Sequence, residues 1–256
     1  MSDVERQAKQ VFGERAAFYT TSPIHADQAL LEHLVALARL SPTDRVLDVA
    51  TGTGHTALAF APHVREVVGC DLTPEMLAEA EKLRAAQGIA NLTLTTCSAL
   101  DLPFADGEFD VVTCRRAAHH FSDVRRALRE MRRVLKPGGR LIVDDRSVPE
   151  DDFVDATMNR LDFLHDESHV RQYRPSEWAA LLAETGYEVE LIEPYTRHRA
   201  LTSLTANVAP ERVAEIHAIV AALTPAQRAA MSVEARDGET YTDHWYLTAV
   251  GVRPSP

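Results

Sequence analysis

Short apolar runs alternate with amphipathic stretches through the first 150 residues of the chain. The first run begins at Arg45 and ends in a glycine-rich stretch, and the next four span 64–71, 92–97, 109–114 and 140–144. Each is rich in β-branched residues and has the length of a buried strand. Strands that alternate with helices over this distance predict an α/β fold with a parallel sheet and right-handed crossovers.

The spacing of apolar residues between these runs predicts helices. Residues 3–19 and 25–39 are expected to form two amphipathic helices before the first strand. Further helices are expected at 55–61, 73–87 and 123–135. The run Lys136-Pro137-Gly138-Gly139 should break the last of these, because proline and two glycines cannot continue a stable helix.

Beyond Val148 the periodicity weakens. The expected elements are a helix at 150–166, a helix at 175–184, a sixth strand at 187–192, two helices within 209–231 and a seventh strand at 240–252. This last run alternates and contains Tyr241, Trp245 and Tyr246, which is typical of an antiparallel strand that closes a sheet. The helical piece between the sixth and seventh strands is predicted to be an insertion that covers a site.

Composition narrows the classes of function. With 256 residues, of which 45% are hydrophobic, the chain is long enough for one large domain. Its net charge of −11 opposes a phosphate backbone, so we expect no nucleic-acid partner. The chain has no long apolar segment and no apolar leader, so we expect a cytoplasmic protein without membrane insertion. We also expect a monomer or homodimer. Cys70, Cys97 and Cys114 are too far apart for a Cys-x-x-Cys metal site, and we interpret them as small buried hydrophobic residues.

The glycine-rich stretch after the first strand is the leading candidate for a ligand-binding loop. Gly52 and Gly54 allow a sharp turn and a close approach to a ligand, and the amides that open the next helix would point at it. Gly52-x-Gly54-x-x-Ala57 also satisfies the dinucleotide-binding pattern. Asp71, nineteen positions after Gly52, suits the ribose of either kind of ligand. The loop alone therefore leaves both ligands open.

Five motifs in order decide between them. They are Val46 to Gly54, Gly69-Cys70-Asp71, Ala99 to Phe104, Phe109 to Val112 and Leu135 to Gly139. Together they resemble the class I S-adenosylmethionine-dependent methyltransferases, most closely the ubiquinone/menaquinone C-methyltransferase-like group. The resemblance implies a Rossmann-like seven-stranded sheet of order 3-2-1-4-5-7-6 with strand seven antiparallel. It also implies S-adenosylmethionine as cofactor and a small-molecule acceptor, in a single domain with a helical lid (1–40), a cofactor-binding core (41–148) and an acceptor side (149–256).

The resemblance also implies roles for individual residues. The methionine part of the cofactor would lie on Asp48, Ala50, Thr51, Gly52, Thr53 and Gly54. Asp71 would bind both ribose hydroxyls, since a carboxylate offers two acceptor oxygens to a diol. Leu72 would pack on the adenine, Ser98 and Ala99 would meet its amino edge, and Arg115 would lie at the methionine end. Many relatives have glycine in place of Ala50 and Asp or Asn in place of Ser98, which puts cofactor affinity in question.

Candidate catalytic residues follow the fourth strand. Methyl transfer is an in-line displacement in which the cofactor brings the leaving group, so the protein mainly aligns the reactants. A base is needed only when the acceptor must lose a proton. His119 and His120 would face the methyl group, and either is a candidate proton acceptor. Adjacent residues point in different directions, so one of the two is expected to be structural.

A second polar cluster follows the fifth strand and consists of Asn159, Asp162, His165, Asp166, His169, Arg171 and Tyr173. It is interpreted either as a polar lid over the acceptor or as a solvated helix face. It contains no compact ligand motif, so we expect no metal.

Other segments are expected to border the site. Tyr19, with Arg15, Phe18 and 20–25, is a candidate N-terminal gate, and Asp144 and Asp145 are further lining candidates. The aromatic residues Phe153, Phe163, Trp178 and Tyr195 either wall an apolar pocket for a ring-bearing acceptor or pack in the core.

Three functions therefore stay open at this stage. They are a small-molecule methyltransferase, a cofactor-binding accessory protein without catalysis, and an NAD(P)-dependent oxidoreductase. The Leu-Pro-Phe and Lys-Pro-Gly-Gly elements favour the first over the third.

Overall fold

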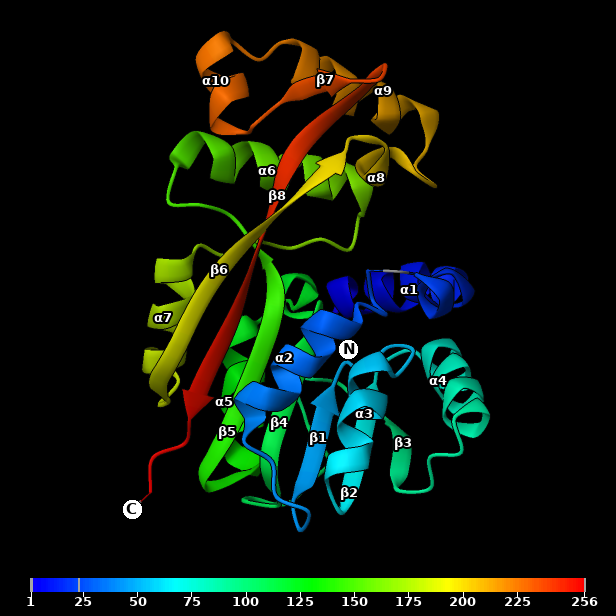
Figure 1. Ribbon diagram of the computed structural model, residues 1–256, viewed down its shortest axis with the longest axis vertical. Coiled ribbons are helices and arrows are strands. Elements are labelled where there is room, and N and C mark those ends of the chain that lie inside the picture. The colour runs from blue at the N-terminus through cyan, green and yellow to red at the C-terminus, as the bar shows by residue number, and fades with distance from the viewer. Residues whose placement is uncertain (1, 23, 256) are drawn as a thin grey trace.

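The computed structural model describes residues 2–22 and 24–255, and one mixed sheet runs through them (Figure 1). Its strands are β1 (Arg45–Val49), β2 (Glu66–Asp71), β3 (Leu92–Thr96), β4 (Phe109–Arg115), β5 (Leu135–Ser147), β6 (Glu188–Ala200), β7 (Glu234–Arg236) and β8 (Glu239–Val252). Their order is β3-β2-β1-β4-β5-β8-β6, with β7 paired to β8. The strand β8 is antiparallel to β5 and β6, whereas the pairings from β3 to β5 are parallel. The predicted fold class and strand order are confirmed; the short β7 was not predicted and makes the closing strand the eighth.

Helices cover both faces of this sheet. They are α1 (Asp3–Thr21), α2 (Gln28–Ala38), α3 (His55–Phe60), α4 (Pro74–Ala86), α5 (Val124–Val134), α6 (Asp152–His165), α7 (Pro175–Glu184), α8 (Thr202–Thr205), α9 (Pro210–Ala221) and α10 (Pro225–Ala230), with 3₁₀ turns η1 (Ala61–His63) and η2 (Ala118–His120). All the predicted helices are present, and the predicted insertion before the closing strand consists of α8, α9, α10 and β7. The pattern missed α8, which is only four residues long.

Two strands are longer than predicted. The Lys136–Gly139 run does end α5, but β5 begins at Leu135, which pairs with Phe109 before the register shifts and Arg140 pairs with Val111. Gly138 has φ +78°, so this strand start is irregular rather than a loop. The strand β6 continues eight residues beyond the predicted end at Ile192, because β8 pairs with it along that whole length. Its second half is polar and largely exposed, so hydrophobic periodicity could not reveal it.

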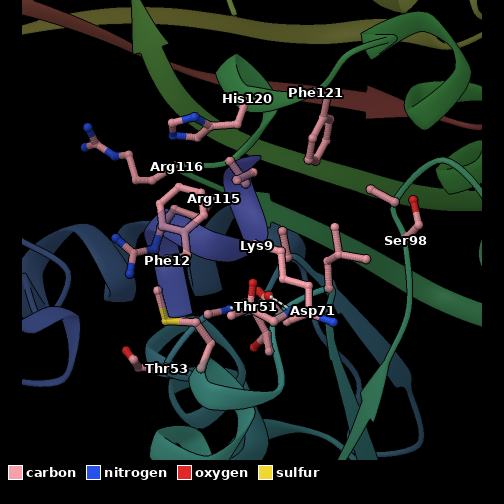
Figure 2. A pocket seen from close by; sticks show the side chains of 18 of the residues that line it. Lys9, Phe12, Thr51, Thr53, Asp71, Ser98, Arg115, Arg116, His120 and Phe121 are labelled. Atoms are coloured by element: carbon pink, nitrogen blue, oxygen red, sulfur yellow. Dashed lines mark hydrogen bonds between the residues drawn. The ribbon is translucent and has the colours of Figure 1, made fainter. Parts of the chain in front are cut away.

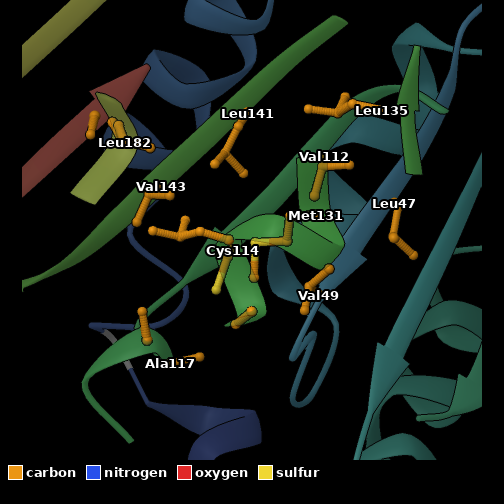
Figure 3. Packing of buried hydrophobic residues seen from close by; sticks show 14 of the residues in the cluster. Leu47, Val49, Val112, Cys114, Ala117, Met131, Leu135, Leu141, Val143 and Leu182 are labelled. Carbon is orange, nitrogen blue, oxygen red and sulfur yellow. The ribbon is translucent and has the colours of Figure 1, made fainter. Parts of the chain in front are cut away.

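Side chains from the buried strands alternate between two cores. Leu47 and Val49 face α5 and α7, together with residues of the neighbouring strands such as Val112 and Val143 (Figure 3). Val46, one residue before Leu47, faces the opposite side, in a cluster with residues of α2 and α3. This period of two on central strands buried on both faces is what a sheet sandwiched between helices requires.

The long strands β6 and β8 extend past the sheet and carry a separate helical layer (Figure 1). There α6, α8 and α9 pack on a third core around Met158, Leu161 and Ile216. The helix α1 lies between this layer and the sheet (Figure 1). The site described below is therefore bordered by three parts of the chain that are far apart in sequence. Over the described residues, no helix combines the length and apolar character needed to cross a bilayer.

Candidate active site

A cavity of about 140 Å³ lies at the carboxyl ends of β1, β2 and β4. Figure 2 shows Thr51 and Asp71 at one end of this first cavity and His120 and Phe121 at the other. Its wall is completed by α1, which contributes Phe12 among others. A ligand in this position would touch the loop after β1 and the ends of the central strands, the usual binding edge of a parallel sheet.

The loop after β1 is held from behind by Asp48. This buried carboxylate accepts hydrogen bonds from the hydroxyls of Thr51 and Thr113, both at 2.6 Å, and from the amide of Ala57 at 3.2 Å. Burial raises the pKa of Asp48, and these hydrogen bonds counteract that effect. Asp48 therefore lies beneath the loop and fixes its shape.

Three loop residues have left-handed backbone conformations. Gly52 has φ +53°, and a Cβ built there would meet no atom within 4 Å, so the open space in front of it belongs to the cavity. Gly54 has φ +86° and precedes α3, and a Cβ there would lie 3.1 Å from the side chain of Ala80. Ala50 has φ +54°, a conformation that is strained for a residue with a Cβ but not for glycine.

Two charged side chains frame the cavity. Asp71 accepts the amide of Gly52 at 2.8 Å and the amide of Thr73 at 2.9 Å, one on each carboxylate oxygen. Burial raises the pKa of Asp71. Arg115 donates from Nε to the Thr56 hydroxyl and from Nη2 to the His25 carbonyl. Its buried Nη1 has no hydrogen-bond partner within the described chain, which leaves this donor available to a ligand.

Most of the residues singled out for the cofactor do line this cavity. They are Ala50, Thr51, Gly52, Thr53, Asp71, Leu72, Ser98, Ala99 and Arg115. Asp48 and Gly54 support the loop from outside the cavity wall. Cys97 also lines the cavity and is half-buried, whereas Cys70 and Cys114 are fully buried as predicted.

The contribution of α1 to the first cavity was not predicted from the sequence. Glu5, Lys9 and Phe12 line the first cavity, and Glu5 accepts a 2.6 Å hydrogen bond from the Ser98 hydroxyl. Glu5 also completes a capping box with Ser2 at the start of α1. That Ser-x-x-Glu spacing is visible in the sequence and marks the helix start, but it does not say which side of α1 faces the sheet.

A second cavity of about 170 Å³ adjoins the first. The residues that line both are Phe12, Tyr19, His25, Arg116 and His120. We call this shared border the junction. The second cavity lies between α1, the loop after β4 and the layer built on β6 and β8.

Part of the predicted polar cluster lines this second cavity, namely Asp162, His165, Asp166 and His169. Asn159 instead fixes the 166–173 segment, since its side-chain oxygen accepts the Gln172 amide at 2.7 Å. Arg171 forms ion pairs with Asp155 and Glu177, and Tyr173 packs against the core between the sheet and the helices α5 and α7. The cluster is thus divided between a cavity wall and its supports, and it is not simply a solvated face.

Part of the predicted N-terminal gate also borders the second cavity, namely Arg15, Phe18, Tyr19, Ser22, Ile24 and His25. Thr20 and Thr21 do not line it, and residue 23 of the predicted gate lies outside the described residues. The other lining candidates support the site from behind. Asp144 pairs with Arg116 at 2.8 Å and accepts the Tyr195 hydroxyl at 2.7 Å. Trp178 and Phe153 pack in cores, and Phe163 is exposed at the surface.

The two adjacent histidines have different partners. His119 is buried, and both its backbone amide and its ring Nδ1 bond to the carboxylate of Asp145, at 2.9 and 2.5 Å. Burial lowers the pKa of His119 well below its usual range and raises that of Asp145 to about 6. These shifts favour a neutral His119 ring, which donates its Nδ1 proton to Asp145.

His120 lies at the junction and is held by a short relay. The Ser168 hydroxyl donates to Asp166 at 2.7 Å, and it lies 3.0 Å from Nδ1 of His120. Because a hydroxyl has one proton, Ser168 must accept the Nδ1 proton of His120. Burial opposes ionisation of Asp166, but His120, Ser168 and Arg15 outweigh it and bring its pKa to about 2. A neutral His120 thus carries its lone pair on Nε2.

Comparisons with known proteins show that the chain is similar to methyltransferases. Residues 47–143 match the model of a methyltransferase domain. An uncharacterised methyltransferase, YcgJ of Bacillus subtilis, is 43% identical over 67% of this chain and 68% of its own length. A demethylmenaquinone methyltransferase of Thermus thermophilus is 43% identical over 46% of this chain, which spans 54% of that enzyme. The crystal structure of YcgJ aligns with a TM-score of 0.83 at 33% identity, over 88% of this chain and 98% of that one.

Proposed function

The chain belongs to the class I S-adenosylmethionine-dependent methyltransferases, and we propose that it transfers the cofactor's methyl group to a small, ring-bearing acceptor by in-line displacement. The observation that carries this proposal is the pair of cavities that share one border at the junction. Two reactants bound in adjoining cavities meet at one place, and such proximity accounts for much of the rate of a displacement.

The residues of the first cavity fit the cofactor. Bound S-adenosylmethionine supplies an electrophilic methyl group together with its leaving group. Asp71 keeps lone pairs for a ribose diol after accepting two amides, and the unpartnered Nη1 of Arg115 suits the methionine carboxylate. The open space before Gly52 leaves room for the ligand against the backbone. Leu72, Ser98 and Ala99 would border the adenine.

A ring-bearing acceptor is supported by the aromatic lining of the second cavity. Phe12, Phe18, Tyr19 and Tyr246 present ring surfaces there, and flat ligands stack favourably on such surfaces. The relative from Thermus thermophilus is named for a quinone-derived acceptor, which is also a ring compound. These aromatic residues differ from the four that the sequence singled out, so the ring-binding wall comes mainly from α1.

Of the two candidate bases, we favour His120. It lines both cavities, whereas His119 lines only the second and is buried against Asp145. The Ser168–Asp166 relay fixes the ring so that Nε2 is free to take a proton from a phenol or another weak acid. His119 would then position the loop and its neighbour, since the two rings lie 4.0 Å apart.

Calorimetry with S-adenosylhomocysteine and with NAD(H) tests the cofactor assignment, and only the former is expected to bind. Binding of NAD(H) alone would refute this assignment and favour an oxidoreductase. Mass spectrometry for a 14 Da gain on a panel of phenols, catechols and quinols, with S-adenosylmethionine present, then tests catalysis. A protein that binds S-adenosylhomocysteine but methylates no acceptor in a metabolite extract would fit an accessory role instead.

The role of His120 is tested by His120→Ala and Ser168→Ala, with His217→Ala on exposed α9 as a matched control. His120→Ala should lower turnover of a phenolic acceptor roughly 100-fold without weakening S-adenosylhomocysteine binding. Ser168→Ala should shift the pH dependence of turnover, because it removes the acceptor for the Nδ1 proton. Unchanged turnover and pH profile in His120→Ala would exclude this role.

A further inference from the structure

The second cavity contains an excess of positive charge. Four arginines line it, namely Arg15, Arg116, Arg146 and Arg199, but only two carboxylates do, Asp162 and Asp166. Arg116 is neutralised from behind by Asp144, Arg146 lies 2.7 Å from Asp162, and Arg15 lies 3.9 Å from Asp166.

Arg199 is the exception. Across residues 2–22 and 24–255, no carboxylate lies within ion-pair distance of its guanidinium, which donates only to the Tyr246 hydroxyl, at 3.3 Å. It is half-buried on β6. A half-buried guanidinium that faces a cavity without a counter-ion favours an anionic ligand, since its charge is poorly compensated by the protein.

The same wall contains buried polar atoms without hydrogen bonds. In the described chain these include Nε of Arg146, the hydroxyl of Ser203 and Oδ2 of Asp162, whose Oδ1 is paired with Arg146 and whose side chain is only 3% exposed. Buried polar groups in native proteins are nearly always hydrogen-bonded, so unpartnered atoms that line one cavity indicate a ligand. Two of these groups can donate and Asp162 can accept.

The arginines converge on one ring. The Arg116 guanidinium lies 3.8 Å from the centroid of Tyr246, that of Arg146 lies 5.9 Å from it, and Arg199 contacts the hydroxyl. Burial alone would raise the pKa of Tyr246, yet the three arginines lower it. Burial and Arg146 likewise lower the pKa of His165 to about 4, so it adds no charge of its own near neutrality. The positive field of this wall is therefore due to the arginines.

We propose that the methyl acceptor carries an anionic group, a carboxylate or a phosphate. This group binds to Arg199, to Nε of Arg146 and to Ser203, and it lies at the opposite end of the acceptor from the reacting atom. Asp162 accepts a hydrogen bond from a hydroxyl or amino group beside that anion. The reacting atom then lies near His120, at the junction. This inference rests on the proposed function for the place of the methyl group and goes beyond it by naming the acceptor's chemical class.

The test measures binding of small probes by ligand-observed NMR, with and without saturating S-adenosylhomocysteine. The probes are benzoate, phenylacetate, mandelate and phenyl phosphate, with benzamide, phenylacetamide and mandelamide as uncharged partners. Acids should bind at least roughly tenfold more tightly than their amides, because the amide cannot form a charge-assisted hydrogen bond to arginine. Mandelate should bind more tightly than phenylacetate, since only mandelate offers a hydroxyl to Asp162.

Substitutions then locate the anion. Arg199→Gln should abolish the preference for acids, and Arg199→Lys should retain part of it. Arg197→Gln is the matched control, because Arg197 lies on the same strand but is exposed and pairs with Asp27. It should bind acids as the unmodified protein does.

Three results would overturn the proposal: no acid binds, amides bind as well as acids, or the preference survives in Arg199→Gln. Equal binding of mandelate and phenylacetate would refute the proposed hydrogen bond from the acceptor to Asp162. The proposed function fails separately, through loss of S-adenosylhomocysteine binding. Because the probes are also tested without S-adenosylhomocysteine, either idea can be refuted alone.

Discussion

Two buried carboxylates on α6 should respond in opposite ways when they are replaced by asparagine. Asp162 is 2% exposed and Asp155 is 6% exposed, and they lie two turns apart on one helix. Burial raises the pKa of Asp162 from 3.8 to about 6, and Arg146 only partly offsets this effect. Burial also acts on Asp155, but hydrogen bonds from Arg171 and Arg174 outweigh it and lower its pKa.

The sign of the pH dependence follows from these directions. The native state holds a proton on Asp162 more tightly than the unfolded chain does, so this residue's contribution to stability declines as the pH rises through about 6. A rise from 3.8 to about 6 corresponds to at most ~3 kcal/mol. Asp162→Asn, which cannot ionise, should therefore match the unmodified protein near pH 4 and exceed its free energy of unfolding by up to ~3 kcal/mol above pH 7.

Asp155→Asn is the contrasting variant. It removes charged hydrogen bonds from two arginines and should lower the free energy of unfolding at pH 7 by about 2 kcal/mol. Since the native pKa of Asp155 is lowered, this loss should shrink only as the pH falls below the ordinary range of an aspartate.

Urea unfolding at several pH values between 4.5 and 8, followed by far-ultraviolet circular dichroism, measures both effects. Other titrating groups are present in every variant, so their contributions cancel in the difference. A gain for Asp162→Asn that does not change with pH, or a loss at every pH, would refute the reasoning that burial of this carboxylate is costly. A gain in stability together with weaker binding of mandelate would show that the buried carboxylate of Asp162 lowers stability but contributes to acceptor binding.

Other predictions concern the cofactor side. Ala50→Gly should raise the free energy of unfolding by roughly 0.5–1 kcal/mol, because glycine relieves the left-handed strain at φ +54° but adds entropy to the unfolded chain. If the Ala50 methyl also crowds the ligand, calorimetry should show tighter S-adenosylhomocysteine binding, and unchanged affinity would exclude crowding. Asp71→Asn should weaken S-adenosylhomocysteine binding roughly 10- to 100-fold, the cost of one charged hydrogen bond, whereas Asp106→Asn at the exposed surface should not. Equal affinities of these two variants would contradict the ribose assignment.

The cofactor side could be anticipated because its determinants are local. The loop from Ala50 to Gly54 is set by the strand before it and the helix after it, and Asp71 ends the strand paired with β1. Parallel strands with their carboxyl ends at one edge bring such residues together whatever the distant parts of the chain do. The order of the sheet followed from the resemblance of five motifs in this same region.

The acceptor side could not be derived in this way. Arg199 lies on the part of β6 that extends beyond the predicted end at Ile192, and its position depends on pairing with β8, where it faces Thr242. Asp162, on α6, meets Arg146, on β5, only because the helical layer packs over the ends of these strands. Nothing in the local spacing of these residues indicates that they share a cavity.

The sequence by itself therefore determined the kind of fold, the cofactor loop and the pair of candidate histidines. Only the tertiary structure decided that His120 stands at the junction while His119 is held by Asp145, and that α1 provides Glu5 and Phe12. The physical reason is the range of the contacts. Backbone periodicity and turn chemistry act over a few residues, whereas a cavity wall is assembled from side chains more than a hundred residues apart, whose meeting depends on strand register and helix packing.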